Sequence, residues 1–349
     1  MTISSITVNR SNLKDVKNLY ISAFPKEERL PWWLLRVLSL RGGIDLNCFY
    51  SEGQFCGFTF SATEGDIIFI LFFAVREDLR AKGYGSAILE YIKSTNPAKS
   101  ILLNVELLDK KADNYEQRVA RMSFYRKNGF YDTMYNIDEV GGTFRVLATS
   151  PTIDREAYLR VFSMMSYGFW KPRIVKIVLE TKRLWIREYE QSDFNGLKDI
   201  ICDAETMKYY EKPYDENGVQ SWLDWCMRSY AENGFGLWAL ELKETGEFIG
   251  DCGVSLQNIN GEILPEIGYH INKKCWNHGY AKEAAGAVRA WFFKNTDYES
   301  VYSYMNKENK ASIATAKANG MTFVGEYVDG WEELSIYSIS RERYRRLYE

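Results

Sequence analysis

Two short turns of small residues carry the clearest chemical signal in this sequence. Gly83-Tyr84-Gly85 and Gly279-Tyr280-Ala281 each follow an apolar run and precede a stretch with helical spacing of apolar residues. A turn between a strand and a helix leaves the first N–H groups of the helix unpaired, and these groups bind phosphate oxygens with the help of the helix dipole. Small residues are needed because a Cβ atom would keep a diphosphate away from the main chain. Taken alone, such a pattern is equally typical of a plain structural turn.

The spacing around the two turns indicates an internal repeat. Gly83 lies eight positions after Val75, and Gly279 lies eight positions after Ile271. Asn128-Gly129-Phe130 follows the first turn, and Asn319-Gly320-Met321 follows the second at a similar distance. A length of 349 residues also suits two domains. We therefore predict two copies of one fold, with an N-terminal domain over 1–149, a connector over 150–178 and a C-terminal domain over 179–349.

Composition excludes several kinds of chemistry. The only histidines are His270 and His278, so the first half has neither a histidine-based triad nor a multi-histidine metal site. The six cysteines form no Cys-x-x-Cys pair, which argues against a zinc knuckle and a disulfide framework and favours a reducing cytosol. We expect no metal.

Charge and hydropathy bear on partners and location. Residues 1–175 carry a net charge of +4 and residues 176–349 one of −7, which does not suggest nucleic acid and mildly favours a cationic or amine substrate for the second half. An ordinary solvated surface explains the same asymmetry. The N-terminus lacks a basic region followed by an apolar core, and the longest apolar run, 67–75, is too short to span a bilayer. These patterns predict a cytoplasmic protein without a membrane partner.

The expected elements alternate in the same order in both copies, which predicts an α/β (α+β) fold. The first copy reads as a capped helix at 11–23, strands at 48–51, 57–63 and 67–75, a helix from 85 to 94, a strand at 100–107, a helix near 116–128 and a strand at 143–148. Residues 154–165 have helical spacing and belong to the connector. The second copy reads as a strand at 184–188, a helix capped by Ser192-Asp193, a hairpin of 236–242 and 248–256, a strand at 266–271 and a helix from 281 to 293.

The first copy resembles the GNAT superfamily of acetyl-CoA-dependent N-acetyltransferases. The resemblance rests on residues 73–89, which end a strand in Ala74-Val75 and continue through Arg80-Ala81-Lys82-Gly83-Tyr84-Gly85, and on the helix end at 124–130. The second copy is similar to the branch of ribosomal-protein N-terminal acetyltransferases, over 180–187, 248–250, 265–269, 276–284 and 309–312. It departs from the wider pattern at Trp276, Asn277, His278 and Met321.

The resemblance implies two tandem GNAT-type folds, each a mixed and mainly antiparallel sheet flanked by helices with a splayed central strand pair. It implies acetyl-CoA as co-substrate, attacked directly by an amine, while a strand N–H group near 72–75 or 269–271 holds the developing oxyanion. The residues implied to contact acetyl-CoA are Phe73, Ala74, Val75, Arg80, Ala81, Lys82, Gly83, Tyr84, Gly85 and Ser86 in the first copy, and His270, Ile271, Trp276, Asn277, His278, Gly279, Tyr280, Ala281 and Asn309 in the second.

The resemblance also suggests groups that move protons. Tyr125 lies at the family's position for the acid that protonates the departing thiolate, and a core tyrosine is the alternative. In the second copy Ala316 occupies that offset, so Ser312 is the candidate donor and Asn309 the pantetheine contact. Glu266 is the candidate general base, although a structural carboxylate is an open alternative; Glu106 is a weaker candidate in the first copy. Trp32-Trp33 and Tyr209, Tyr210 and Tyr214 fall where substrate walls are built, but aromatic residues there are as often core.

The sequence therefore predicts an acyltransferase that moves an acetyl group to a primary amine, on a peptide N-terminus or on a small molecule such as an aminoglycoside or a polyamine. One copy, more readily the first, could instead be a non-catalytic acyl-CoA-binding or docking module. Another phosphate ligand is disfavoured, because neither turn ends in Gly-Lys-Ser/Thr or has dinucleotide spacing. A monomer and a homodimer are both compatible with the sequence.

Overall fold

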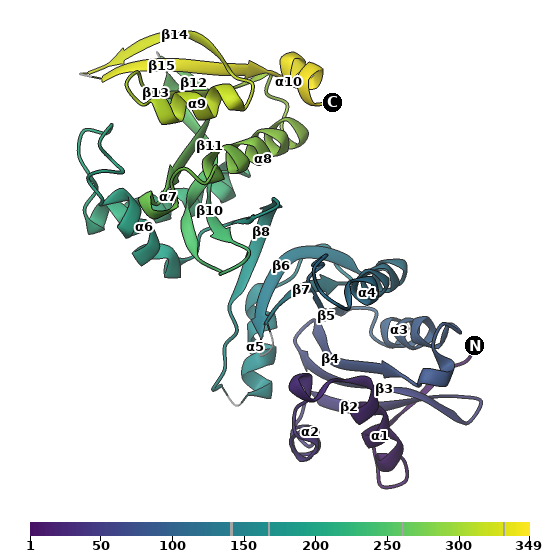
Figure 1. The fold of residues 1–349 in the computed structure, drawn as a ribbon. Helices are drawn as coiled ribbons and strands as arrows, with labels where there is room; N and C mark the ends of the chain where they lie inside the picture. The colour runs from purple at the N-terminus through teal and green to yellow at the C-terminus, as the bar shows by residue number, and fades with distance from the viewer. Residues whose placement is uncertain (140–141, 167, 260, 331) are drawn as a thin grey trace. The chain divides into compact units, whose positions relative to one another are not determined.

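The computed structural model describes residues 1–139, 142–166, 168–259, 261–330 and 332–349. The chain divides into two compact units, Met1–Ile174 and Val175–Glu349 (Figure 1). Each unit is built on its own sheet with helices on both faces, which is the mixed α/β architecture that the sequence predicts.

The sheet of unit 1 has the strand order β1-β2-β3-β4-β5-β7-β6. Its strands are β1 (Ser4–Thr7), β2 (Ile44–Ser51), β3 (Gln54–Glu64), β4 (Ile67–Val75), β5 (Ser100–Glu106), β6 (Tyr131–Glu139) and β7 (Gly142–Ala148). Strands β4 and β5 are parallel, and their pairing stops at Ile70 opposite Leu103 although both strands continue. The central pair is thus splayed, as predicted. The β3–β4 ladder also shifts register, which leaves Leu71 as an extra residue in β4.

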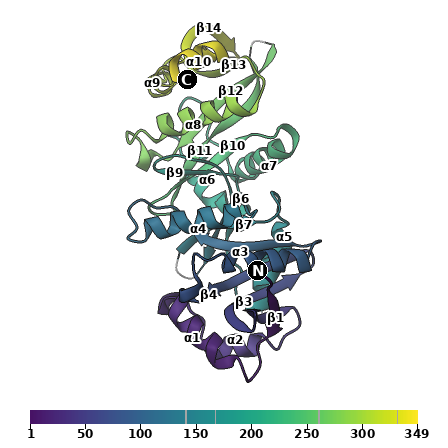
Figure 2. The same ribbon diagram turned by 90° about the vertical axis from the view of Figure 1, so that its right-hand side faces the viewer.

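Helices cover both faces of this sheet because β4 is apolar along its whole length. Figures 1 and 2 show the sheet between α1 (Leu13–Ala23) and α2 (Trp32–Leu38) on one side and α3 (Tyr84–Thr95) and α4 (Tyr115–Lys127) on the other. The α1–α2 side also receives α5 (Arg155–Met165), whose Tyr158 and Phe162 pack on Phe69 of β4. Much of the predicted connector is therefore part of unit 1.

The sheet of unit 2 repeats this plan in the order β8-β9-β10-β11-β12-β13-β15-β14. Its strands are β8 (Ile174–Glu180), β9 (Leu184–Arg187), β10 (Leu237–Leu242), β11 (Phe248–Ile259), β12 (Glu262–Ile271), β13 (Ser300–Asn306), β14 (Thr322–Asp329) and β15 (Glu332–Ser340). The parallel pair β12–β13 meets at Glu266 opposite Tyr302 and then diverges. The β11–β12 register runs without a shift, so this copy has no counterpart of the Leu71 bulge.

The helices of unit 2 divide between the two faces of its sheet. Helix α8 (Tyr280–Asn295) packs on β11 and β12, and α9 (Lys310–Ala318) packs on α8 and β13. Helices α6 (Phe194–Ile201) and α7 (Glu216–Asn233) form a separate core with β10 on the opposite face, and α10 (Arg341–Tyr348) follows β15. Sequence periodicity did not reveal α7. Asp193 is the N-cap residue of α6, as predicted, but its side chain does not cap the helix; its carboxylate instead accepts hydrogen bonds from the Arg187 guanidinium and the Glu190 N–H.

Candidate functional site

Both predicted phosphate turns have the backbone shape that the small residues suggested. Helix α3 begins after Gly83 and helix α8 after Gly279, and both glycines are left-handed, with φ of +86° and +78°. Neither helix start is capped by a side chain. The first N–H groups of α3 and α8 are thus available to phosphate oxygens, which is the observation that makes these turns fit a diphosphate.

The predicted cofactor contacts cluster at these turns. The residues of unit 1 lie on the last part of β4 (Phe73, Ala74, Val75), in the exposed turn (Arg80, Ala81, Lys82, Gly83) and in the first turn of α3 (Tyr84, Gly85, Ser86). Their unit 2 counterparts lie at the end of β12 (His270, Ile271), in the turn (Trp276, Asn277, His278, Gly279) and at the start of α8 (Tyr280, Ala281).

Arg183 supplies a cation that the second turn lacks in its own sequence. It precedes β9, and its guanidinium donates to the His278 carbonyl at 2.9 Å and lies over the Tyr280 ring at 4.4 Å. A salt bridge of 2.7 Å to Glu283 of α8 fixes this position. The sequence did not point to Arg183, because Arg183 and the turn are far apart in sequence and meet only through tertiary packing. Unit 1 instead carries Arg80 and Lys82 within the turn.

The strand before each turn presents N–H groups to the gap between the splayed strands. The Asn272 N–H donates to the Ile249 carbonyl at 2.8 Å, on the β11 side of β12. Because N–H groups alternate along a ladder, those of Tyr269 and Ile271 point to the β13 side, where pairing has ended. In unit 1 the Arg76 N–H donates to the Cys56 carbonyl of β3. By the same alternation, the N–H groups of Phe73 and Val75 point to the gap beside β5. These four N–H groups are candidate oxyanion donors.

Ser312 and Asn309 occupy the start of α9, beside the diverging strands. The Asn309 side chain caps the helix by accepting from the Ser312 N–H at 3.1 Å, and the Ser312 hydroxyl lies 2.8 Å from the Tyr269 hydroxyl. Burial raises the pKa of Tyr269 to about 12 despite the hydrogen bond to Ser312, so Tyr269 stays protonated. The structure thus brings two hydroxyl groups together where the sequence suggested one.

Tyr125 of unit 1 lies in a different setting. Its half-buried ring packs between Phe124 and Phe130, with centroids 5.2 and 5.6 Å away. Burial raises its pKa to about 12, and the charge of Arg121 lowers it slightly. The hydroxyl makes no hydrogen bond to the residues that the structure describes, so it is free to donate one.

Glu266 lies on β12 where the strand leaves β13, and its side chain points to the α6–α7 face. Burial raises the pKa of Glu266 to about 7, against the opposing effects of the His270 charge, the Tyr304 main chain and the Ser255 hydroxyl. A carboxyl group with this pKa exchanges a proton near neutral pH, as a general base requires.

A buried polar chain that the sequence did not reveal extends from the same strand face. The His270 Nδ1 lies 2.9 Å from Asp251 Oδ1, and its Nε2 lies 2.8 Å from the Tyr210 hydroxyl. Asp251 is fully buried and also accepts from the Tyr189 hydroxyl at 2.9 Å. The His270 side chain therefore faces away from α8 and the turn. The hairpin register that sets Asp251 opposite His270 is the signal that could have found this pair.

The segment between α6 and α7 holds Tyr210 over the strand ends. Lys273, just after β12, forms an ion pair of 2.6 Å with Asp203 of this segment. The Tyr209 hydroxyl donates to the Glu308 carbonyl, just after β13, at 3.1 Å. The segment is thus tied to both sides of the gap. Trp222 of α7 completes a wall against His270, with ring centroids 5.2 Å apart.

Unit 1 lacks this polar chain at the matching positions. Ala74 precedes Val75 as His270 precedes Ile271, and the residue opposite Ala74 on β3 is Phe58. Phe69 matches Glu266 once the Leu71 bulge is counted. All three belong to the apolar core of unit 1. Glu106, the weaker base candidate, is bound by Arg118 and Arg121 of α4 and by Asn114.

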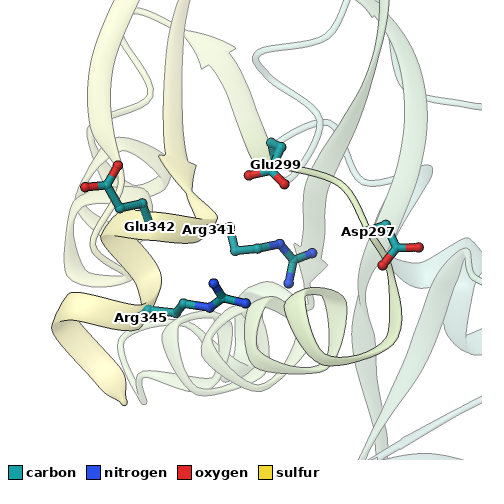
Figure 3. Close-up of a pocket in the computed structure, with 5 residues that line it drawn as sticks. All are labelled: Asp297, Glu299, Arg341, Glu342 and Arg345. Atoms are coloured by element: carbon teal, nitrogen blue, oxygen red, sulfur yellow. The ribbon is translucent and has the colours of Figure 1, made fainter.

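Two surface hollows are lined by other residues than these. One hollow of about 420 Å³ in unit 2 is lined by Asp297, Glu299, Arg341, Glu342 and Arg345 (Figure 3). Arg341 donates to the Phe293, Thr296 and Tyr298 carbonyls there, so it fastens α10 to the end of α8. Among the described residues, no group of three or more His, Cys, Asp and Glu side chains is arranged to hold a metal ion. In the same part of the chain, no helix combines the length and apolarity needed to cross a membrane.

Comparison with known families agrees with the repeat. The acetyltransferase (GNAT) domain matches twice, over residues 45–132 and over residues 183–322. The chain belongs to the GNAT acetyltransferase family. Protein YkkB of Bacillus subtilis (strain 168) is 34% identical over 149 residues, which are 42% of this chain and 87% of YkkB. The N-acetyltransferase YnaD of the same strain is 29% identical over 144 residues, 41% of this chain and 81% of YnaD.

A solved acetyltransferase from Agrobacterium tumefaciens str. C58 is 26% identical, with a TM-score of 0.43, over 47% of this chain and 94% of that one. As a GNAT protein, the chain is an acyltransferase that moves an acetyl group from acetyl-CoA to an amine. Each match covers one unit, so the chain contains two GNAT domains in tandem.

Proposed function

We propose that unit 2 carries out the acetyl transfer and that its acceptor is a primary amine bound on the α6–α7 side of β12. The single observation that carries this proposal is the half-buried Glu266, whose pKa of about 7 suits a proton acceptor at the point where β12 and β13 part. An amine reaches this position as an ammonium ion and must lose a proton before it can attack.

The other groups follow from the same geometry. The start of α8, with Arg183 beside it, binds the diphosphate of acetyl-CoA, and Asn309 lies along its pantetheine arm. The N–H groups of Tyr269 and Ile271 stabilise the oxyanion of the tetrahedral intermediate. Ser312, paired with Tyr269, donates a hydrogen bond to the departing thiolate. The net charge of −7 over residues 176–349 favours a cationic acceptor, either a peptide N-terminus or a small amine.

A second function is supported for unit 1. Its turn fits a diphosphate as well as that of unit 2 does, and Tyr125 is placed to be its thiolate donor. However, β4 offers Phe69 and Ala74 where β12 has Glu266 and His270. We propose that unit 1 binds acetyl-CoA and contributes little or nothing to turnover.

The proposed location is a reducing one. The six cysteines are all free, which suits the cytosol, where acetyl-CoA is also available.

Thiol release from acetyl-CoA tests the proposed activity. The full chain is given acetyl-CoA with a short peptide that has a free N-terminus, with spermidine, or with kanamycin, and the acetylated product is identified by mass spectrometry. We expect release that depends on one of these amines and is lost in Glu266→Gln. Release no faster than without amine, for all three, would contradict the proposal.

A further inference from the structure

We propose that Tyr210, His270 and Asp251 form a proton relay that takes a second proton from the acceptor amine, after Glu266 has taken the first. The inference rests on the proposed function of unit 2. An ammonium ion that becomes an amide loses two protons, so a site that binds the ion itself needs two places to put them.

The hydrogen bonds give the relay a direction. Asp251 Oδ1 accepts from the main-chain N–H of His270 at 3.0 Å and lies 2.9 Å from its Nδ1, and Asp251 Oδ2 accepts from Tyr189. A carboxylate that collects these donors fixes the His270 proton on Nδ1 and leaves a lone pair on Nε2. The Tyr210 hydroxyl, 2.8 Å away, then donates to Nε2. The remaining lone pairs of the Tyr210 oxygen are left to accept a proton from a ligand.

Burial separates the two ends of the chain. Asp251 is fully buried and His270 is 8% exposed, whereas Tyr210 is 42% exposed. The charge that results when His270 accepts a proton is therefore held away from water. The titratable groups around His270 are Asp251 on β11, Glu266 on β12, Tyr304 on β13, Tyr189 after β9, Tyr210 and Tyr214 before α7, and Cys226 on α7.

The Asp251 carboxylate biases the ring toward accepting a proton, and the charge of Glu266 adds to this effect only until Glu266 takes a proton itself. Burial lowers the pKa of His270, but the charge and hydrogen bond of Asp251 and the charge of Glu266 raise it more, so the net direction is upward. Burial and the charges of Glu266 and Asp251 raise the pKa of Tyr210 well above its ordinary value, so Tyr210 passes a proton on without becoming an anion.

The amine nitrogen, which has already lost one proton to Glu266, forms a bond to the carbonyl carbon of the acetyl group. The C–S bond then breaks, and its electron pair stays on sulfur. The nitrogen gives its second proton to the Tyr210 oxygen while the Tyr210 proton moves to His270 Nε2. The imidazolium is paired with Asp251 and later returns its proton to water, and the thiolate leaves as the CoA anion, hydrogen-bonded to Ser312 until solvent protonates it.

The first test observes the relay without any acceptor. His270 and His278 are the only histidines, so the full chain with His278→Gln and ¹⁵N-labelled histidine gives one imidazole to titrate by NMR. We expect the Nδ1–H tautomer above the pKa, a pKa above the ordinary 6.5, and a lower pKa in Asp251→Asn. An Nε2–H tautomer, or a pKa that Asp251→Asn does not change, would overturn the relay.

The second test measures its role in turnover, with the amine that gives the fastest thiol release among the peptide, spermidine and kanamycin. Tyr210→Phe should lower kcat about 100-fold and leave the KM for acetyl-CoA unchanged. In the Glu266→Gln variant, kcat should still fall toward low pH, because protonated His270 cannot accept a proton. Adding His270→Gln should remove this remaining fall. Tyr298→Phe, which removes the same atom from a similarly exposed tyrosine between α8 and β13, should match the wild-type enzyme.

The two proposals fail in different ways. An active wild-type enzyme in which Tyr210→Phe behaves like Tyr298→Phe would overturn the relay and leave the proposed function standing. A wild-type enzyme that acetylates none of the three amines would overturn the proposed function, and the catalytic role of the relay with it.

Discussion

Both units have a phosphate turn, but they differ in the side chains that the strand before the turn places on its other face, away from the helix that follows the turn. In unit 2, β12 presents Glu266 and His270 to the α6–α7 face, with Asp251 opposite His270. In unit 1, β4 presents Phe69 and Ala74, with Phe58 opposite Ala74, and all are buried among the α1, α2 and α5 side chains. The fold thus supports cofactor geometry in both copies, whereas the groups that handle protons occur on one strand only.

The helices that follow the splayed strands also differ in the groups that they offer for proton transfer. Helix α9 offers Ser312, which lies against the Tyr269 hydroxyl and has no charged partner among the described residues. Helix α4 places Arg118 and Arg121 on the Glu106 carboxylate at the end of β5. The Glu106 carboxylate is thus engaged in ion pairs, which suits a structural role better than proton transfer.

The largest effect is expected on stability, when Phe69 of unit 1 is replaced by the glutamate that unit 2 has at the matching position. Phe69→Glu puts a carboxyl group among Tyr158, Phe162 and the other core side chains of unit 1, where burial removes its hydration and the phenyl contacts are lost. We expect the free energy of unfolding to fall by about 4 kcal/mol or more. Urea unfolding of the full chain, followed by fluorescence, measures it.

Phe69→Leu is the matched control, with an expected loss of about 1 kcal/mol. Equal and small losses for both variants would mean that unit 1 tolerates a polar group here as unit 2 does, and would remove the main difference between the copies.

The pH dependence of turnover should follow Glu266. Its raised pKa of about 7 means that the group is protonated, and unable to accept a proton, at lower pH. We expect kcat/KM to fall toward acid, by roughly 100-fold between pH 7 and pH 5. Steady-state rates from pH 5 to pH 9 measure it. Because deprotonation of the free amine contributes equally to both enzymes, the difference between wild type and Glu266→Gln isolates the carboxyl group, and parallel profiles would refute its role.

The two phosphate turns should respond differently to the same strain. Gly279→Ala forces a left-handed alanine at the start of α8, which costs about 1 to 2 kcal/mol and should raise the KM for acetyl-CoA roughly tenfold. Gly83→Ala imposes the same strain on unit 1 and should leave that KM unchanged. Steady-state titration with acetyl-CoA compares them, and a larger effect from Gly83→Ala would move the turnover to unit 1.

The smallest effect is expected at the thiolate donor. Ser312→Ala removes one hydrogen bond to the leaving group, worth about 1 kcal/mol, so kcat should fall roughly fivefold. Tyr269 remains as a nearby hydroxyl, which limits the loss. Single-turnover rates with saturating acetyl-CoA measure it; an unchanged rate would assign Ser312 a purely structural role beside the Asn309 cap.

Local patterns predicted the elements that carry their own signals. The glycine turns predicted helices near 85–94 and 281–293, and the structure has them at Tyr84–Thr95 and Tyr280–Asn295. The hairpin over Glu244-Thr245-Gly246 is also present as β10 and β11. Helix α7 was missed because Trp222, Trp225 and the polar residues between them give no clean apolar stripe.

The site was predictable only where its residues are neighbours in sequence or match the family pattern. Each turn is one continuous segment, so spacing located it. The contact between Asp251 and His270 depends on the exact register of a long hairpin, and a shift of one residue would have turned either side chain to the other face. Arg183 and Tyr210 reach the site from other segments through tertiary packing alone.

If the polar face of unit 2 performs the reaction, loss of the Glu266 carboxyl group should slow turnover far more than loss of the Tyr125 hydroxyl of unit 1. The kcat of the full chain is measured at saturating acetyl-CoA for Glu266→Gln and for Tyr125→Phe. We predict a loss of about 100-fold or more for Glu266→Gln and no change for Tyr125→Phe. A large loss in Tyr125→Phe with Glu266→Gln near the wild-type rate would contradict the account and place the reaction in unit 1.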